Sequence, residues 1–194
     1  MAGKNSKVEY LKPPYTYIQR IIKMAINQIE LRSKALKYAS RTDNAEFSAP
    51  YQKKKTAFLC HSHLDEQMVK GLVVLFQEAE IDLYIDWQDA AMPEKPNNIT
   101  AKKIQRKIIE QDIFLFLATE NAKQSRWCPW EIGYADAKTK KIYVIPTSDG
   151  KNTYGNEYLE LYASIDTNIY YPGNYLVNKP NERFGQPLLN STLF

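Results

Sequence analysis

The chain has 194 residues, of which 44% are hydrophobic and 25% charged, and its formal net charge is +4. These values are typical of a globular protein with one well-buried domain and about 50 residues to spare. Lysine and arginine are spread along the chain with acids between them, so no basic stripe predicts nucleic-acid binding, and no apolar run approaches the ~18 residues of a membrane span.

The chain contains two cysteines, Cys60 and Cys128. Two cysteines do not make a disulfide framework, and both are expected to be reduced thiols. Nothing at the start of the sequence resembles a cleaved signal peptide. The expected location is therefore the cytoplasm.

Residues 1–52 are expected to form a helical extension and a linker. Pro13-Pro14 is a typical helix start, and isoleucines then recur at helical spacing from Ile18 to Ile29, in a helix that would end near Ala39. Such a helix must bury its apolar face. It would pack either on the following domain or against another subunit, and the sequence favours neither.

From Thr56 onward, apolar strand-like runs alternate with helical patterns. Strands are expected at 56–60, 81–86, 112–118, 141–146 and 167–171, with helices at 65–79, from 100, at 127–140 and, more weakly, at 154–163. This alternation predicts an α/β fold, a flavodoxin-like three-layer sandwich with a five-stranded parallel sheet in the order 2-1-3-4-5. The domain would span 53–172, and 173–194, rich in proline and glycine, would be an extended tail.

Polar and aromatic residues follow three of the predicted strands where each ends. They are His61, Ser62 and His63 after the first strand, Asp86 and Trp87 after the second, and Thr119, Glu120 and Asn121 after the third. In this topology the loops after the first and third strands flank the crevice in which ligands bind. A candidate site is therefore expected at this edge of the sheet.

Trp127 and Glu131 open the helix that follows the third strand. They are four residues apart, so both project from one face of that helix. An aromatic ring can stack on a base, and a single carboxylate can stabilise the oxocarbenium-like sugar formed when a cationic nicotinamide leaves its ribose. Taken singly, Glu131 would be an ordinary exposed helix residue and Trp127 a core residue.

Other chemistries find little support. The sequence has neither GxGxxG nor a Walker loop, and seven glycines in all. His61 and His63 would point the same way in an extended segment, which makes an incomplete metal pair. We therefore predict no metal site and no bound cofactor.

Three segments resemble the Toll/interleukin-1 receptor (TIR) domain family. Residues 56–62 (TAFLCHS) resemble its first-strand box, 83–86 (LYID) its second strand leading into the BB loop, and 127–131 (WCPWE) the Trp-Cys-x-x-Glu signature of its αC helix. The resemblance covers residues 53–172. Cys60 stands in place of the usual serine, and beyond Asp86 the BB loop lacks the common Arg-Asp-x-x-Pro-Gly pattern.

The resemblance implies an enzyme that cleaves the nicotinamide–ribose bond of NAD+, which is its substrate. Glu131 matches the catalytic glutamate and Trp127 the aromatic residue before it, Asp86 matches the acid that begins the BB loop, and His61 and Ser62 lie in the loop facing the nucleotide. Trp87, beside Asp86, is the remaining expected substrate-binding residue. The product would be ADP-ribose or a cyclic ADP-ribose.

The resemblance also implies a biological setting. Stand-alone proteins of this kind resemble the Thoeris-like enzymes of anti-phage defence, which sense infection and signal to a separate effector through their nucleotide product. Self-association through the TIR domain is expected as well. The alternative function is a non-catalytic interaction module or a mimic of host signalling.

Overall fold

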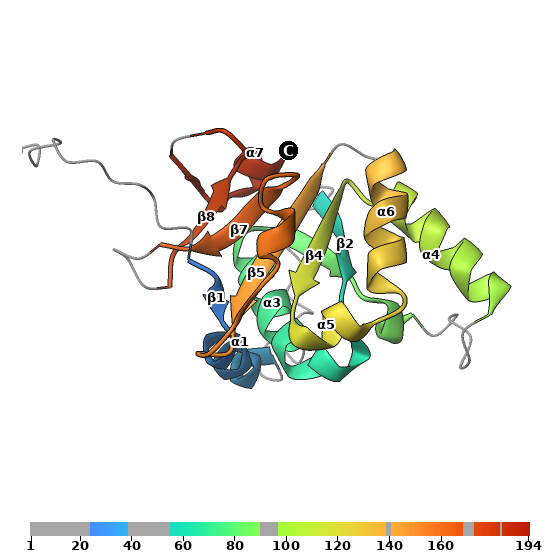
Figure 1. Ribbon diagram of the computed structural model, residues 1–194, viewed down its shortest axis with the longest axis horizontal. Helices are drawn as coiled ribbons and strands as arrows, with labels where there is room; N and C mark the ends of the chain where they lie inside the picture. Colours follow the sequence, from blue (N-terminus) through green and yellow to red (C-terminus); the bar gives the residue numbers. More distant parts are fainter. Residues whose placement is uncertain (1–23, 39–54, 90–96, 139–140, 169–172, 183) are drawn as a thin grey trace, which may run out of the picture.

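The computed structural model describes residues 24–38, 55–89, 97–138, 141–168, 173–182 and 184–194 (Figure 1). Within these ranges one mixed sheet of nine strands lies between two layers of helices. Its main path runs β3-β2-β4-β5-β7-β8-β9. The chain therefore has a mixed α/β fold around a largely parallel sheet.

Five strands of the main path are parallel to one another: β2 (Lys55–Cys60), β3 (Ile81–Tyr84), β4 (Ile113–Ala118), β5 (Ile142–Ser148) and β7 (Ala163–Thr167). Strand β2 pairs with both β3 and β4, with Phe58 opposite Tyr84 on one side and Phe114 on the other. All six residues of β4 are buried. A strand buried on both faces reads as a continuous apolar run, which is why the sequence located this one well.

Helices cover both faces of the sheet (Figure 1). Helices α3 (Glu66–Glu78) and α1 (Gln28–Lys34) pack on one face with Leu59 and Leu115, and α4 (Asn98–Glu110) and α6 (Cys128–Lys138) pack on the other with Phe58 and Phe116. Successive strand residues point to opposite faces, so each strand contributes to both cores. The short helix α5 (Glu120–Gln124) connects β4 to α6.

The described part of the N-terminal region belongs to this same body. Strand β1 (Ile26–Asn27) pairs with β5, and α1 continues into a 3-10 turn at Ala35–Lys37. A Cβ added at Gly71 in α3 would lie 1.9 Å from the carbonyl oxygen of Leu31, so α1 approaches α3 as closely as a glycine allows. Residues 28–34 thus form a helix as expected and pack on the domain, but Ile26–Asn27, expected in the same helix, form a strand instead. The part of the expected helix from Pro13 to residue 23 lies outside the described residues.

Three expectations for the C-terminal third are wrong. The fifth strand, expected at 167–171, is β7 at Ala163–Thr167. The helix expected at 154–163 is instead β6 (Thr153–Tyr154), a 3-10 turn at Asn156–Tyr158 and the start of β7. The expected tail joins the sheet through β8 (Tyr175–Asn178) and β9 (Gln186–Pro187), both antiparallel, and ends in α7 (Asn190–Leu193). The five-stranded parallel sheet is therefore part of a larger mixed one.

The sequence failed to predict these strands because they are short and lie next to turn residues. Gly173 adopts a left-handed conformation (φ +86°) just before β8, and β8 is only four residues long. Tyr175 and Val177 are its buried hydrophobic residues, and this alternation is too short to stand out among prolines and glycines. In the described ranges no helix is long and apolar enough to cross a membrane.

Candidate functional site

A cavity of about 340 Å³ opens where β2 and β4 end. This volume is at the lower end of the range for small-molecule pockets. The cavity is lined by His61, Ser62, His63, Leu64, Asp86, Thr100, Ile104, Asn121, Gln124, Ser125, Trp127 and Glu131. It lies between the neighbouring strands β2 and β4, from which the chain proceeds in opposite directions across the sheet, as expected for ligand sites in open α/β folds.

Asp65 connects the segment that follows β2 to the segment that follows β4. Its side chain is 2% exposed and accepts hydrogen bonds from Thr119 Oγ1 at 2.5 Å and from Asn121 Nδ2 at 2.6 Å. Asp65 ends the 3-10 turn His63–Asp65 that follows β2, whereas Thr119 is the N-cap of α5 after β4. A carboxylate that accepts hydrogen bonds at both oxygens fixes the two loops relative to each other.

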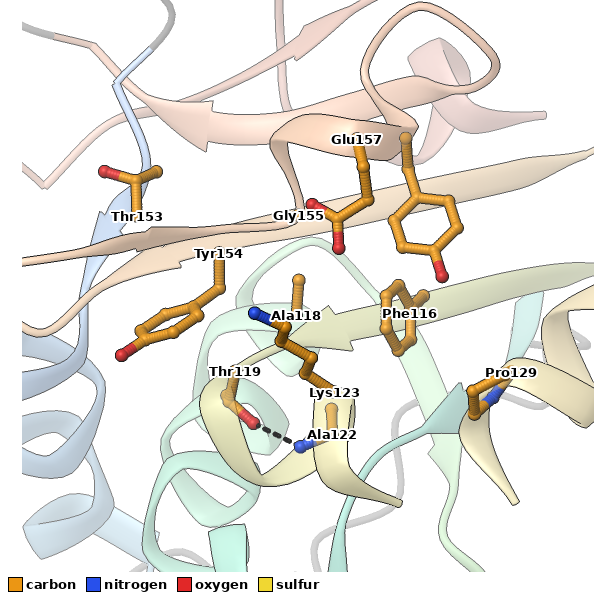
Figure 2. A pocket seen from close by; sticks show the side chains of 11 residues that line it. Phe116, Ala118, Thr119, Ala122, Lys123, Pro129, Thr153, Tyr154, Gly155 and Glu157 are labelled. Carbon is orange, nitrogen blue, oxygen red and sulfur yellow. Dashed lines mark hydrogen bonds between the residues drawn. The ribbon is translucent and has the colours of Figure 1, made fainter. Parts of the chain in front are cut away.

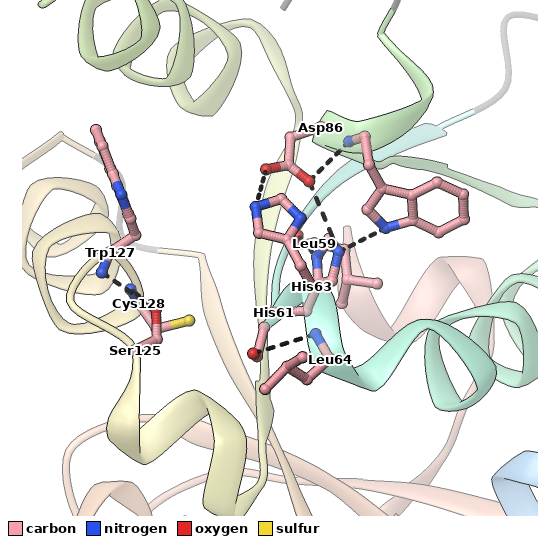
Figure 3. A network of polar contacts seen from close by, with 10 residues as sticks. Leu59, His61, His63, Leu64, Asp86, Ser125, Trp127 and Cys128 are labelled. Atoms are coloured by element: carbon pink, nitrogen blue, oxygen red, sulfur yellow. Dashed lines mark hydrogen bonds and ion pairs between the residues drawn. The ribbon is translucent and has the colours of Figure 1, made fainter. Parts of the chain in front are cut away.

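His61 makes two hydrogen bonds and lies near a carboxylate (Figure 3). Its Nδ1 lies 2.9 Å from the carbonyl oxygen of Leu59, so Nδ1 carries the proton. Its Nε2 accepts a hydrogen bond from Trp87 Nε1 at 2.8 Å and lies 3.6 Å from Asp86 Oδ1. Burial lowers the pKa of His61, which agrees with the neutral tautomer that these contacts require.

Asp86 links this histidine to a second one. Its Oδ1 also accepts the backbone N–H of Trp87 at 2.8 Å, and its Oδ2 lies 3.8 Å from Nε2 of His63. His63 is largely exposed, whereas His61 is buried. One carboxylate therefore lies between a fixed imidazole and an accessible one.

Helix α6 begins on the opposite side of the cavity from this histidine pair (Figure 3). Ser125 Oγ accepts hydrogen bonds from the backbone N–H groups of Trp127 at 3.1 Å and Cys128 at 3.3 Å. The N–H of Glu131 bonds to the carbonyl of Trp127 at 2.8 Å, so the two residues are one helical turn apart. Trp127 is half-buried, and its ring packs edge-on against Trp130 with 5.4 Å between centroids.

Glu131 is buried, with 6% of its surface exposed, in the wall of the cavity. Burial raises its pKa to about 8, and a hydrogen bond from the Cys60 side chain lowers it in part. The Cys60 thiol is fully buried and also lies 3.9 Å from the carbonyl oxygen of Cys128. A buried carboxyl with a strongly shifted pKa in a cavity wall is typical of a functional group, since nothing in folding favours its burial.

Five of the six residues predicted from the sequence line this one cavity: His61, Ser62, Asp86, Trp127 and Glu131. The sixth, Trp87, is not among the lining residues; it packs against the core on the α3 side and supports the ring of His61. Sequence reasoning assigned no role to Asp65, which precedes α3 as an ordinary helix-start acid. It also missed Thr100 and Ile104, whose spacing in α4 is that of any amphipathic helix.

A second, smaller cavity of about 120 Å³ lies on the other side of α5, between the end of β4 and residues 153–158 (Figure 2). Lys123 and Glu157 are the charged residues of its lining. None of the predicted site residues reaches it. The cavity between β2 and β4, which the predicted residues line, is therefore the candidate active site.

Comparison with known proteins identifies the family of the chain. The sequence profile of the TIR domain matches residues 57–168, which is more than half of the chain. A protein of Bacillus cereus (strain MSX-D12) named "Probable 3' cyclic ADP-D-ribose synthase ThsB'" is 33% identical over 113 residues, covering 56% of this chain and 58% of that protein. A protein of Cytobacillus dafuensis named "Putative cyclic ADP-D-ribose synthase TIR2" is 27% identical over 95 residues, covering 47% of this chain and 25% of that protein.

Proposed function

Because the chain belongs to the TIR domain family, we propose that it cleaves the nicotinamide–ribose bond of NAD+ in the cavity between β2 and β4. The observation that carries this proposal is the buried carboxyl of Glu131 in the cavity wall, one helical turn from Trp127. The curated relatives are named as cyclic ADP-ribose synthases, and such a product requires this bond to break first. The chain spans less than two thirds of the length of either relative.

Glu131 would act on the sugar. The nicotinamide ring leaves with the electron pair of its bond to ribose and becomes neutral, so no general acid is needed. The positive charge passes to the ribose carbon, where a nearby carboxylate stabilises it. Trp127, at the same end of α6, offers a flat ring for stacking on nicotinamide or adenine.

Glu131 must lose its proton before it can stabilise the cation. With a pKa of about 8, the carboxyl is mostly neutral at pH 7 in the free protein. A bound substrate with a cationic pyridinium ring favours the charged carboxylate and lowers its pKa. NAD+ binding would therefore release a proton from Glu131 to produce the reactive carboxylate.

The ribosyl cation is then captured by a nucleophile. Attack by an adenine or ribose group of the same molecule gives a cyclic ADP-ribose, and attack by water gives ADP-ribose; in both cases the nucleophile loses its proton. We propose the cyclic product, because both curated relatives carry that activity in their names. Assembly through the TIR domain, a phage-derived trigger, a separate effector and a cytoplasmic location stay predictions from the sequence.

The test is incubation of the full chain with NAD+, alone and in lysate of infected cells, with chromatographic separation of nicotinamide, ADP-ribose and cyclic products. We expect Glu131→Gln to lower nicotinamide release by at least about 100-fold, the usual cost of removing one electrostatic stabiliser of a transition state. Glutamine keeps the shape of the side chain, so a loss of activity would reflect the missing charge.

The matched control is Glu120→Gln, which removes the same charge from an exposed acid in the first turn of α5, outside the cavity. We expect it to keep wild-type turnover. Equal activity of Glu131→Gln and wild type would refute the site assignment. A wild-type chain that binds other TIR domains but releases no nicotinamide under either condition would favour the interaction module instead.

A further inference from the structure

Three potential metal ligands meet at one side of the candidate active site (Figure 3). Asp86 lies between His61 and His63, with its oxygens 3.6 Å from Nε2 of the first and 3.8 Å from Nε2 of the second. One ligand atom from each residue falls within a group no wider than 4.8 Å. The sequence indicated only the incomplete His61–His63 pair. The fold places Asp86, which follows β3, beside both histidines.

His61 already has the surroundings of a metal ligand. Its Nδ1–H donates to the carbonyl oxygen of Leu59, which leaves the lone pair on Nε2, the nitrogen that faces Asp86. Metal-bound histidines are held in this way, with the second ring nitrogen donating to a carbonyl or carboxylate. The burial of this ring keeps it neutral and able to coordinate.

We propose that His61 Nε2, His63 Nε2 and an oxygen of Asp86 form a binding site for one divalent transition-metal ion of the Zn²⁺ class. Two imidazoles and one carboxylate are a common donor set for such ions. In a tetrahedral site, ligand atoms lie about 3.3 Å apart. The two histidines approach different oxygens of Asp86, and the three ligand atoms lie within 4.8 Å of one another, so ion binding requires the largely exposed His63 ring to move by up to about 1.5 Å. All three residues line the cavity, so a remaining coordination position is open to a ligand there.

Trp87 competes with the ion for His61. Its Nε1–H donates to the same Nε2 at 2.8 Å, and that nitrogen has a single lone pair. Ion binding therefore requires the indole N–H to move away from the histidine. The arrangement described above and the metal-bound arrangement exclude each other at this one atom, which makes Trp87 both a competitor and a reporter.

This proposal concerns metal binding alone and is independent of the proposed cleavage of NAD+. The test is a titration of the untagged full chain with Zn²⁺ in the absence of nucleotide, followed by calorimetry and by tryptophan emission. We expect one ion per chain and a change in emission as the Trp87 indole is released. Absence of stoichiometric binding would overturn the proposal.

Two variants sharpen the test. His63→Ala changes a largely exposed side chain, so the protein should fold, and we expect it to lose at least about tenfold in Zn²⁺ affinity. Trp87→Phe keeps an aromatic ring but removes the competing N–H, so we expect affinity to rise roughly two- to tenfold, the equivalent of one hydrogen bond. Unchanged affinity in His63→Ala, or weaker binding in Trp87→Phe, would contradict the assignment.

The two thiols are the rival ligands among the described residues, because Cys60, at the end of β2, lies close to Cys128, the first residue of α6. The control is therefore the double variant Cys60→Ser/Cys128→Ser, titrated in the same way. We expect its Zn²⁺ affinity to equal that of the wild type. A loss of binding in this variant would move the ion to the thiols and refute the proposed ligand set.

Discussion

The two faces of the sheet are built differently, although both are covered by helices. On the face of α3 and α1 the contact is so close that Gly71 has no room for a Cβ. On the face of α4 and α6 the core opens at the end of β2 into a cavity whose wall contains the buried acid Glu131. The close contact between α1 and α3 and the candidate chemistry therefore lie on opposite faces of one sheet.

The difference follows from where α6 begins. Its first turn lies over the end of β2, so Cys128 and Glu131 face Cys60 rather than solvent. An isolated carboxyl in such surroundings opposes folding when it is charged. This comparison predicts that changes on the α3 face alter mainly stability, and changes on the α6 face mainly activity and its pH dependence.

The largest effect on stability is expected from Gly71→Ala. A Cβ placed 1.9 Å from a backbone oxygen forces α1 and α3 apart, and overpacking of this kind costs about 3 kcal/mol or more of unfolding free energy. Denaturant titration measures the change. The matched control is Gly133→Ala in α6, where an added Cβ has no atom within 4 Å, and we expect it to be neutral or slightly stabilising. Equal stabilities of the two variants would show that the faces do not differ in packing.

The pH dependence of the unfolding free energy should show how much the buried carboxyl of Glu131 destabilises the fold when it is charged. Its pKa in the folded protein, about 8, lies above the ordinary value of 4.5, so between these pH values the folded state binds more protons than the unfolded state. The free energy of unfolding therefore falls as pH rises from about 5 to about 8, by at most about 1.4 kcal/mol per pH unit for this group. Glu131→Gln should lose this slope, measured by denaturant titration across the range, whereas Glu120→Gln should keep it.

The smallest effect concerns Cys60. A serine hydroxyl at this position would donate a stronger hydrogen bond to Glu131 than the thiol does, and this would lower the pKa of the carboxyl. If Glu131 must be charged, kcat/KM for NAD+ should rise with pH toward about 8 in the wild type. In Cys60→Ser the same rise should occur at lower pH, by less than about one unit. An identical pH profile would show that the thiol does not tune Glu131.

The sequence predicted the first four strands of the parallel sheet and the edge that carries the candidate site for the same physical reason. Buried parallel strands are continuous apolar runs, and the polar residues that follow them must meet at one edge of the sheet. His61, Asp86 and Glu131 could be assigned to one site in this way because each follows a strand that the sequence marks clearly. Strand β8 and the helix expected at 154–163 were misjudged, since short elements near glycine and proline have weak local patterns.

By itself, then, the sequence determined the α/β alternation, the edge of the sheet that carries the candidate site, and the spacing of Glu131 and Trp127, which lie one helical turn apart. Only the tertiary structure decided which side chains and backbone groups these residues contact. The contact of Gly71 with α1, the thiol of Cys60 beside Glu131, and the bond between Trp87 and His61 all join residues distant in sequence. Local periodicity reports which face of an element is apolar, whereas these contacts depend on how whole elements pack against one another.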